Sequence, residues 1–116
     1  MSNDKRLAYL NDIVSATGLI EEFCSGKTVE VYKADSLLRS AVERQLTIVG
    51  EAVTKLLQLD CAMERSISSA RKIVGFRNQL IHNYGSIDSD VVWTVIVQDL
   101  ATLRRECVVL MERSSR

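Results

Sequence analysis

One short segment of the chain carries the residue types from which an active site could be built. Residues 77–84 read Arg-Asn-Gln-Leu-Ile-His-Asn-Tyr and contain the single histidine of the chain, His82. Arginine can hold a phosphate with paired N–H donors, histidine can move a proton near neutral pH, and tyrosine offers a modifiable hydroxyl. This Arg-x4-His-x-Tyr pattern is where we first expect chemistry.

The spacing of Arg77 and His82 limits what one chain can do with them. On a helix, the two side chains are about 140° apart around the axis and about 7.5 Å apart along it. That makes a poor site within one chain. Two chains crossing near a two-fold axis would bring two arginines and two histidines to one cleft. One histidine could then act as base and the other as acid in cleaving an RNA phosphodiester through its own 2′-hydroxyl, without a metal.

Charge is balanced over the whole chain but not around this segment. Lys and Arg number 15 and Asp and Glu number 15, and the net charge of zero argues against a general nucleic-acid binder. The segment 65–87 nevertheless contains no acid and four cations besides His82, namely Arg65, Arg71, Lys72 and Arg77. Two interpretations remain open: a positive binding surface, or a solvated helical face whose acids come from a neighbouring helix.

Composition and periodicity predict that helices position this segment. The chain has no proline and only five glycines, whereas a strand-rich or loop-rich fold of this length would use both in its turns. Apolar spacing predicts a first helix over 4–23, followed by a loop over 26–33. A second helix is expected to begin with a cap at Asp35 or Ser36, and a third to begin after caps in 66–69 and to end in 83–85. A last helix is predicted from the capping signature at Asp88 to Glu112. The β-branched stretch 91–97 could pass for a strand, but its long apolar continuation favours a helix. We predict one all-α domain, 1–116, an antiparallel bundle of about four to five helices.

Two residues of the predicted second helix bear on the motif. Gly50 costs about 1 kcal/mol inside a helix, and a close approach of another helix would compensate. Glu51 is interpreted as a solvated or capping carboxylate, and the alternative is that it orients Arg77. Phe76 and Trp93 are expected in the core rather than as platforms for stacking bases.

Cofactors and membrane segments are not expected. Cys24, Cys61 and Cys107 are widely scattered and a lone histidine cannot complete a usual zinc set, so we expect free thiols and neither a metal nor another cofactor. The N-terminus lacks the apolar run of a secretory signal, and the stretch 91–97 is far shorter than the roughly 20 residues of a membrane span. We therefore expect a cytoplasmic protein.

The residues around the motif resemble a known family. The segment 77–84 resembles the signature of HepT-like proteins, a branch of the HEPN (higher eukaryotes and prokaryotes nucleotide-binding) superfamily. Residues 48–52, Ile-Val-Gly-Glu-Ala, resemble the family's Ile-Ile-Gly-Glu-Ala segment, and 75–78, Gly-Phe-Arg-Asn, resemble its Gly-Met-Arg-Asn entry to the motif helix. Ile87-Asp88 and Val92-Trp93 resemble the opening of its last helix, so the resemblance covers nearly the whole chain.

The resemblance implies a homodimeric, metal-independent endoribonuclease that serves as the toxin of a type VII-like toxin–antitoxin pair. By this resemblance, Arg77 and His82 match the family's catalytic residues, and Asn78 matches the supporting polar position beside the arginine. Tyr84 matches the tyrosine to which a partner antitoxin, a minimal nucleotidyltransferase, transfers AMP. The substrate implied is RNA.

Two other functions remain open from the residues alone. The chain could be a non-catalytic subunit that presents a nucleotide or substrate to a nucleotidyltransferase, although a complete Arg-x4-His-x-Tyr pattern argues against this. It could also be a structural dimerisation module, which would leave the acid-free segment unexplained. Without the family, Tyr84 would be expected as a surface anchor whose ring packs and whose hydroxyl meets water.

Overall fold

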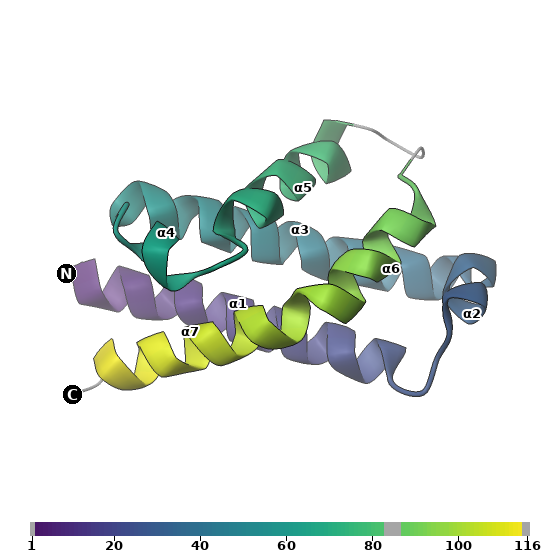
Figure 1. The fold of residues 1–116 in the computed structure, drawn as a ribbon, viewed down its shortest axis with the longest axis horizontal. Coiled ribbons are helices and arrows are strands. Elements are labelled where there is room, and N and C mark those ends of the chain that lie inside the picture. The colour runs from purple at the N-terminus through teal and green to yellow at the C-terminus, as the bar shows by residue number, and fades with distance from the viewer. Residues whose placement is uncertain (1, 83–86, 115–116) are drawn as a thin grey trace.

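Helices joined by short connections make up the part of the chain that the computed structural model describes, residues 2–82 and 87–114. They are α1 (Ser2–Cys24), α2 (Val29–Ala34), α3 (Ser36–Leu59), α4 (Met63–Ser66), α5 (Ala70–His82), α6 (Ser89–Gln98) and α7 (Leu100–Ser114) (Figure 1). The predicted all-α fold is confirmed. The prediction of four to five helices is too low for the described residues, because two short helices were not foreseen and the last predicted helix is divided.

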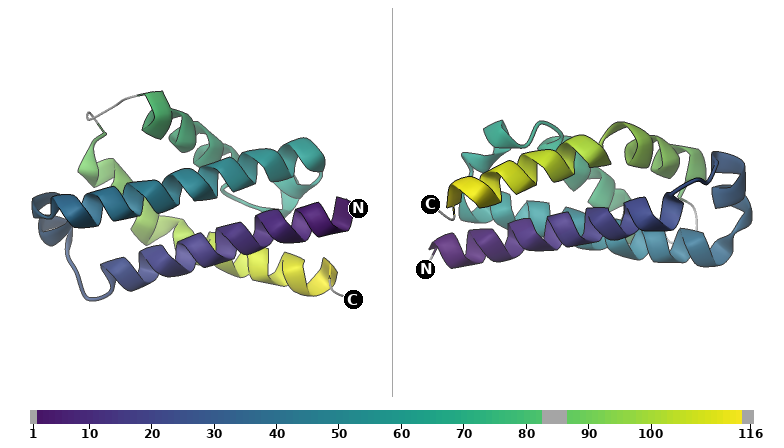
Figure 2. Two further views of the ribbon diagram at one scale, coloured as in Figure 1. Left: turned by 180° about the vertical axis from the view of Figure 1, so that it is seen from behind. Right: turned by 90° about the horizontal axis from the view of Figure 1, so that it is seen from below.

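Three helices form the body of the bundle. The views in Figures 1 and 2 agree that α1, α3 and α7 lie side by side and that α5 lies on the side of α3 away from α1. Their apolar residues recur at three- and four-residue spacing, which gathers them on one face of each helix. The residues that are fully buried there include Leu10, Ile13 and Ile20 of α1, Val42, Val49, Val53 and Leu56 of α3, and Leu100, Leu103 and Cys107 of α7.

The expected loop over 26–33 is wrong in its second half, where α2 forms. Thr28 caps this short helix by accepting a hydrogen bond from the Val31 backbone N–H at 3.3 Å. Tyr32 is fully buried and its ring lies 5.5 Å from the ring of Trp93, centroid to centroid. Helices this short are unstable alone, so burial of Tyr32 against α6 accounts for α2 better than local propensity does.

The predicted caps at Asp35 and Asp88 are confirmed, whereas the Ser69 hydroxyl, directly before α5, has no hydrogen-bond partner among the described residues. Asp35 accepts a hydrogen bond from the Leu38 N–H at 3.0 Å at the start of α3, and Asp88 accepts one from the Asp90 N–H at 2.8 Å at the start of α6. Each carboxylate satisfies an N–H that the helix cannot pair internally. The predicted end of the third helix, in 83–85, lies outside the described residues; the helix is described as far as His82.

The single helix expected from 88 to 112 is wrong, because the chain turns at Asp99 between α6 and α7. Backbone hydrogen bonds continue on both sides, from the Asp99 N–H to the Val95 oxygen and from the Leu103 N–H to the Asp99 oxygen. The Asp99 carboxylate, only 17% exposed, forms an ion pair with Lys72 of α5 at 2.7 Å. The apolar periodicity of the sequence continues without a break through Asp99. It therefore could not predict the division between α6 and α7, where Asp99 contacts another helix.

The cysteines and the hydrophobicity of the helices can be compared with the expectations from the sequence. Cys24, Cys61 and Cys107 are free, as expected, and Cys61 alone of the three is exposed. Burial raises the pKa of the Cys107 thiol to about 12, which makes it unreactive. None of the helices described is both long enough and apolar enough to cross a membrane.

Candidate functional site

The helix α5 presents the candidate site and packs mainly on α3. Ile73 and Phe76, three residues apart, are buried, and Leu80, one turn further, packs partly buried against the core. This spacing turns one face of α5 toward the bundle. Arg77 directly follows Phe76 and so lies at the edge of that face, where its side chain can reach α3. Phe76 is in the core as expected, and Trp93 is partly buried against it.

Gly50 makes the close approach of α3 and α5 possible. A Cβ atom added to Gly50 would lie 2.2 Å from the Arg77 Cβ and 2.6 Å from its Cγ, distances at which non-bonded atoms clash. The aliphatic part of Arg77 therefore occupies the space that any other residue at position 50 would fill. The predicted close helix–helix approach at Gly50 is confirmed, and the neighbour that needs the space is the candidate catalytic arginine itself.

Two acceptors hold the Arg77 guanidinium. Its Nη2 donates to the Glu51 Oε2 at 2.7 Å, and its Nη1 donates to the Asn78 Oδ1 at 3.1 Å. The Arg77 side chain is 24% exposed, so part of the guanidinium still faces solvent. The Arg77 Nε is buried and donates to none of the described residues. Of the alternatives left open for Glu51, the structure shows the one in which it pairs with Arg77, and Asn78 lies beside the arginine.

The Glu51 carboxylate is ionised and shared between two cations. The hydrogen bond from Arg77 is the main cause that holds the pKa of Glu51 below its usual value, with partial burial opposing it and the charges of Arg77 and Lys55 adding to it. Lys55 Nζ lies 3.8 Å from the other carboxylate oxygen. At neutral pH, Glu51 is therefore a fixed anion directly behind the candidate phosphate-binding group.

His82 lies apart from Arg77 within one chain. It is exposed in the last turn of α5. Among the described residues, no hydrogen bond or ion pair joins it to Arg77. This agrees with the angular separation expected on one helix. Tyr84, the fourth residue of interest, lies outside the described residues.

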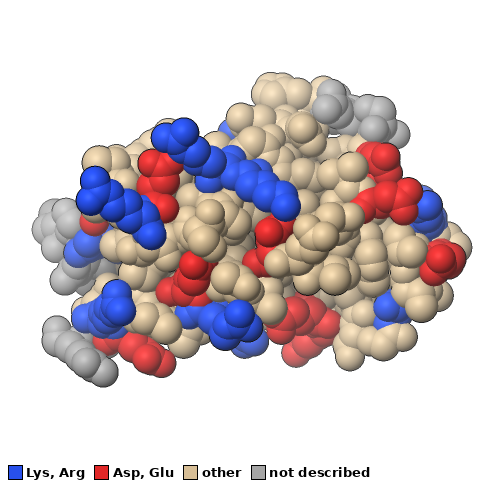
Figure 3. Space-filling view, viewed as in Figure 1, with Lys and Arg blue, Asp and Glu red and all other residues tan. Residues whose placement is uncertain are grey.

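The acid-free segment around the motif is paired with acids from elsewhere. Arg71 pairs with Glu64 of α4, Lys72 with Asp99, and Arg77 with Glu51. Figure 3 shows basic side chains on this face interspersed with acidic ones rather than gathered in a continuous patch. Of the two interpretations, a face whose acids come from neighbouring elements accounts for three of the four cations.

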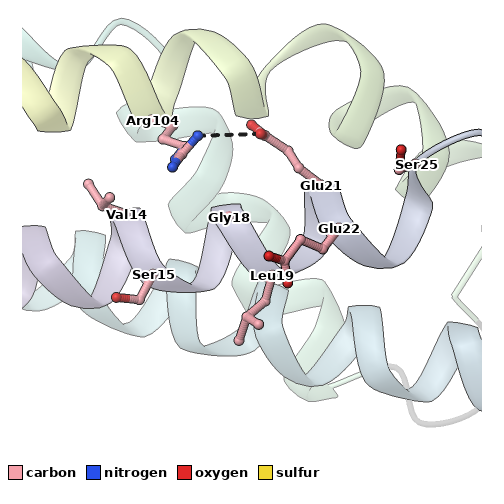
Figure 4. Close-up of a pocket in the computed structure, with 8 residues that line it drawn as sticks. All are labelled: Val14, Ser15, Gly18, Leu19, Glu21, Glu22, Ser25 and Arg104. Carbon is pink, nitrogen blue, oxygen red and sulfur yellow. Dashed lines mark hydrogen bonds and ion pairs between the residues drawn. The ribbon is translucent and has the colours of Figure 1, made fainter.

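A wide groove lies elsewhere on the molecule, between α1 and α7. It encloses about 870 Å³ and is lined by Val14, Ser15, Gly18, Leu19, Glu21, Glu22, Ser25 and Arg104. Arg104 reaches across it to Glu21 at 3.5 Å (Figure 4). None of the described motif residues, 77–82, lines it. Within the described ranges, no group of three His, Cys, Asp or Glu residues is placed to hold a metal ion.

Comparison with known proteins points to one family. The family described as ribonuclease HepT-like matches residues 13–110. The probable ribonuclease HepT of Thermococcus cleftensis is 34% identical over 96 residues, which cover 83% of this chain and 86% of that protein. A putative RNase of Methanocaldococcus jannaschii is 29% identical over 91% of this chain and 96% of its own length. No solved structure gives a significant match.

A further relative is longer than this chain. The gamma-glutamylcyclotransferase and putative RNase of Methanocaldococcus jannaschii is 31% identical over 104 residues, 90% of this chain. The chain spans 46% of that protein's length.

Substitutions at two helical glycines test the close approach. We expect Gly50→Ala to lower the free energy of unfolding by about 1–3 kcal/mol, because the new methyl group must displace Arg77 or separate the helices. A Cβ at Gly75 of α5 would meet no atom within 4 Å, so Gly75→Ala should raise stability by about 0.5–1 kcal/mol through helix propensity. Urea unfolding followed by circular dichroism measures both. Equal stabilisation by the two variants would contradict the packing described.

The ion pair of Glu51 with Arg77 should make the free energy of unfolding depend on pH. A carboxylate whose pKa is lowered by folding stabilises the protein above its unfolded pKa, near the ordinary value of 4.5, and loses that contribution as the pH falls through the folded pKa. We expect Glu51→Gln to be less stable than the native protein at pH 7 and the difference to shrink below about pH 4.5. Urea unfolding across this pH range measures it, and a difference that is the same at pH 7 and pH 3 would contradict the ion pair.

Proposed function

The chain belongs to the ribonuclease HepT-like family, and on this premise we propose that it is a metal-independent endoribonuclease that acts as a homodimer. The family and the ribonuclease class expected from residues 48–52 and 77–84 are confirmed by the match over 13–110. The observation that carries the mechanism is the arrangement on α5. A guanidinium fixed against α3 and an exposed imidazole lie on one helix, at positions matching the family's catalytic residues.

The homodimer follows from the chemistry that the two residues must perform. Within one chain, helical spacing puts Arg77 and His82 about 140° apart around α5, and a single imidazole cannot take up and release a proton in the same step. The helix α5 lies at the edge of the bundle (Figure 1), so a second copy can approach it. A two-fold axis near α5 would supply the second histidine and complete the site.

The reaction that this site supports is a transesterification within the RNA. One His82 takes the proton of the 2′-hydroxyl, and the 2′-oxygen forms a bond to the adjacent phosphorus. The bond from phosphorus to the 5′-oxygen breaks, and the 5′-oxygen receives a proton from the His82 of the second copy. Arg77 donates hydrogen bonds to the phosphate oxygens as their charge increases, with Asn78 supporting the guanidinium. The products carry a 2′,3′-cyclic phosphate and a 5′-hydroxyl.

The toxin–antitoxin role forms the second half of the proposal. The partner would be a minimal nucleotidyltransferase that transfers AMP to Tyr84. The Tyr84 hydroxyl oxygen attacks the α-phosphorus of ATP, pyrophosphate leaves, and the phenolic proton passes to a base or to water. A bulky anion two positions from His82 would repel RNA phosphate and block the cleft. The placement of Tyr84 in the sequence supports this regulation.

Cleavage of RNA by the purified protein tests the nuclease proposal. We expect end-labelled cellular RNA to be cut in the presence of EDTA, giving fragments with 2′,3′-cyclic phosphate ends. His82→Ala should lower the rate by about 10²–10⁴-fold, and Arg77→Ala by about 10²–10³-fold. The matched control is Arg71→Ala, which removes an 86% exposed cation of the same helix.

Two results would contradict this prediction. Activity that disappears with EDTA would exclude the metal-independent mechanism. Tight nucleotide binding by unmodified protein of confirmed mass, with no RNA cleavage, would favour the non-catalytic subunit of a nucleotidyltransferase. Circular dichroism must show that each variant keeps the helical content of the native protein.

Modification at Tyr84 is tested separately. Incubation with a minimal nucleotidyltransferase, ATP and Mg²⁺ should add AMP to the peptide that contains Tyr84 and abolish RNA cleavage. Tyr84→Phe should cut RNA but resist both modification and inhibition, because it lacks the hydroxyl that forms the bond. Mass spectrometry and the cleavage assay measure these outcomes. Addition of AMP to Tyr9 or Tyr32 instead would contradict the assignment.

A further inference from the structure

Glu51 is a charged residue of the site that lies outside the Arg77–Tyr84 motif. It is on α3, and its Oε2 accepts the 2.7 Å hydrogen bond from the Arg77 Nη2. We infer that Glu51 is a positioning residue, which fixes the orientation of the Arg77 guanidinium so that its solvent-facing N–H groups meet the scissile phosphate. This inference rests on the proposed nuclease function.

Consecutive residues of α3 restrain Arg77 at both ends of its side chain. Gly50 receives the Cβ and Cγ, which would lie within 2.6 Å of any side chain there. Glu51 holds the far end at Nη2, and Asn78 holds Nη1 at 3.1 Å. A free arginine samples many rotamers, and these contacts leave little of that freedom. The guanidinium is therefore oriented before the substrate arrives. The entropy of orienting it is then not lost during the reaction, and this lowers the activation free energy.

A carboxylate at this position has an electrostatic cost that argues for a role in orientation. Glu51 is 42% exposed and ionised, so its negative charge also acts on an approaching phosphate. A site that needed only affinity for RNA would do better with Arg77 unpaired. Lys55, 3.8 Å from Glu51, offsets part of this charge. The Glu51 carboxylate thus weakens the electrostatic attraction of the site for phosphate, but it fixes the direction in which the Arg77 N–H groups can donate hydrogen bonds.

Two other roles for Glu51 give different kinetics. If Glu51 served only to join α3 to α5, its loss would lower stability but leave kcat unchanged in folded protein. If it competed with RNA for the guanidinium, its loss would raise kcat/KM. A positioning role predicts a fall in kcat with a KM for RNA that stays the same or decreases, because a repelling charge is removed.

The test measures kcat and KM on a defined RNA for the full-length native protein, Glu51→Gln and Glu51→Asp. We expect Glu51→Gln to lower kcat by about ten- to a hundredfold without raising KM, and Glu51→Asp, which keeps the charge, to recover part of the loss. The matched control is Glu64→Gln, which breaks the ion pair of Arg71 and should leave kcat unchanged. Circular dichroism and urea unfolding exclude variants that are not folded under the assay conditions.

A double variant separates action through Arg77 from any other effect. In the Arg77→Ala background, Glu51→Gln should cause no further loss of activity, since the group that Glu51 positions is gone. Nuclear magnetic resonance of the labelled Arg77 side chain gives a readout other than activity. Rotation of the guanidinium should be slow in the native protein and faster in Glu51→Gln.

The outcomes distinguish the two proposals. No cleavage by the native protein would overturn the nuclease function and this inference together. Native cleavage that Glu51→Gln leaves unchanged or increases, or that it changes only through KM, would overturn the inference alone. Additive losses in the double variant would do the same.

Discussion

The approach of α5 to α3 at Gly50 is the contact on which the candidate site depends. The Arg77 side chain begins in a space that exists only because residue 50 has no Cβ atom. From there the guanidinium reaches the next residue of α3, Glu51, which accepts its hydrogen bond. The cost of a glycine inside a helix is thus offset by a contact that orders the side chain of Arg77.

The charges of the molecule are balanced overall, and most cations near the motif are paired with a nearby acid. The net charge is zero, and the cations of the motif segment are largely paired with Glu64, Asp99 and Glu51. RNA would therefore not be drawn to this chain by a broad positive field, as it is to strongly basic proteins. Recognition would depend instead on a few oriented donors at the cleft, and this makes the geometry of Arg77 more important than the amount of charge around it.

The helices divide their roles between stability and chemistry. The helices α1, α3 and α7 bury most of the apolar residues and form a continuous core. The helix α5 packs mainly on α3, and its far side and its described end, with His82, are exposed and open to a second chain. A rigid body with one peripheral helix is suited to a site completed by dimerisation, since the motif helix can meet its copy without disturbing the core.

The sequence by itself determined the features that depend on local spacing. The absence of proline and the three- and four-residue periodicity predict the helices, Asp35 and Asp88 predict caps, and residues 48–52 and 77–84 predict the family. These signals act over a few neighbouring residues, so they can be read along the chain. Only the tertiary structure decided the short helix around Tyr32, the turn at Asp99 and the choice of Glu51 as the partner of Arg77. Each of these depends on residues from different helices, Tyr32 with Trp93, Asp99 with Lys72 and Arg77 with Gly50 and Glu51, whose contacts form when the bundle packs.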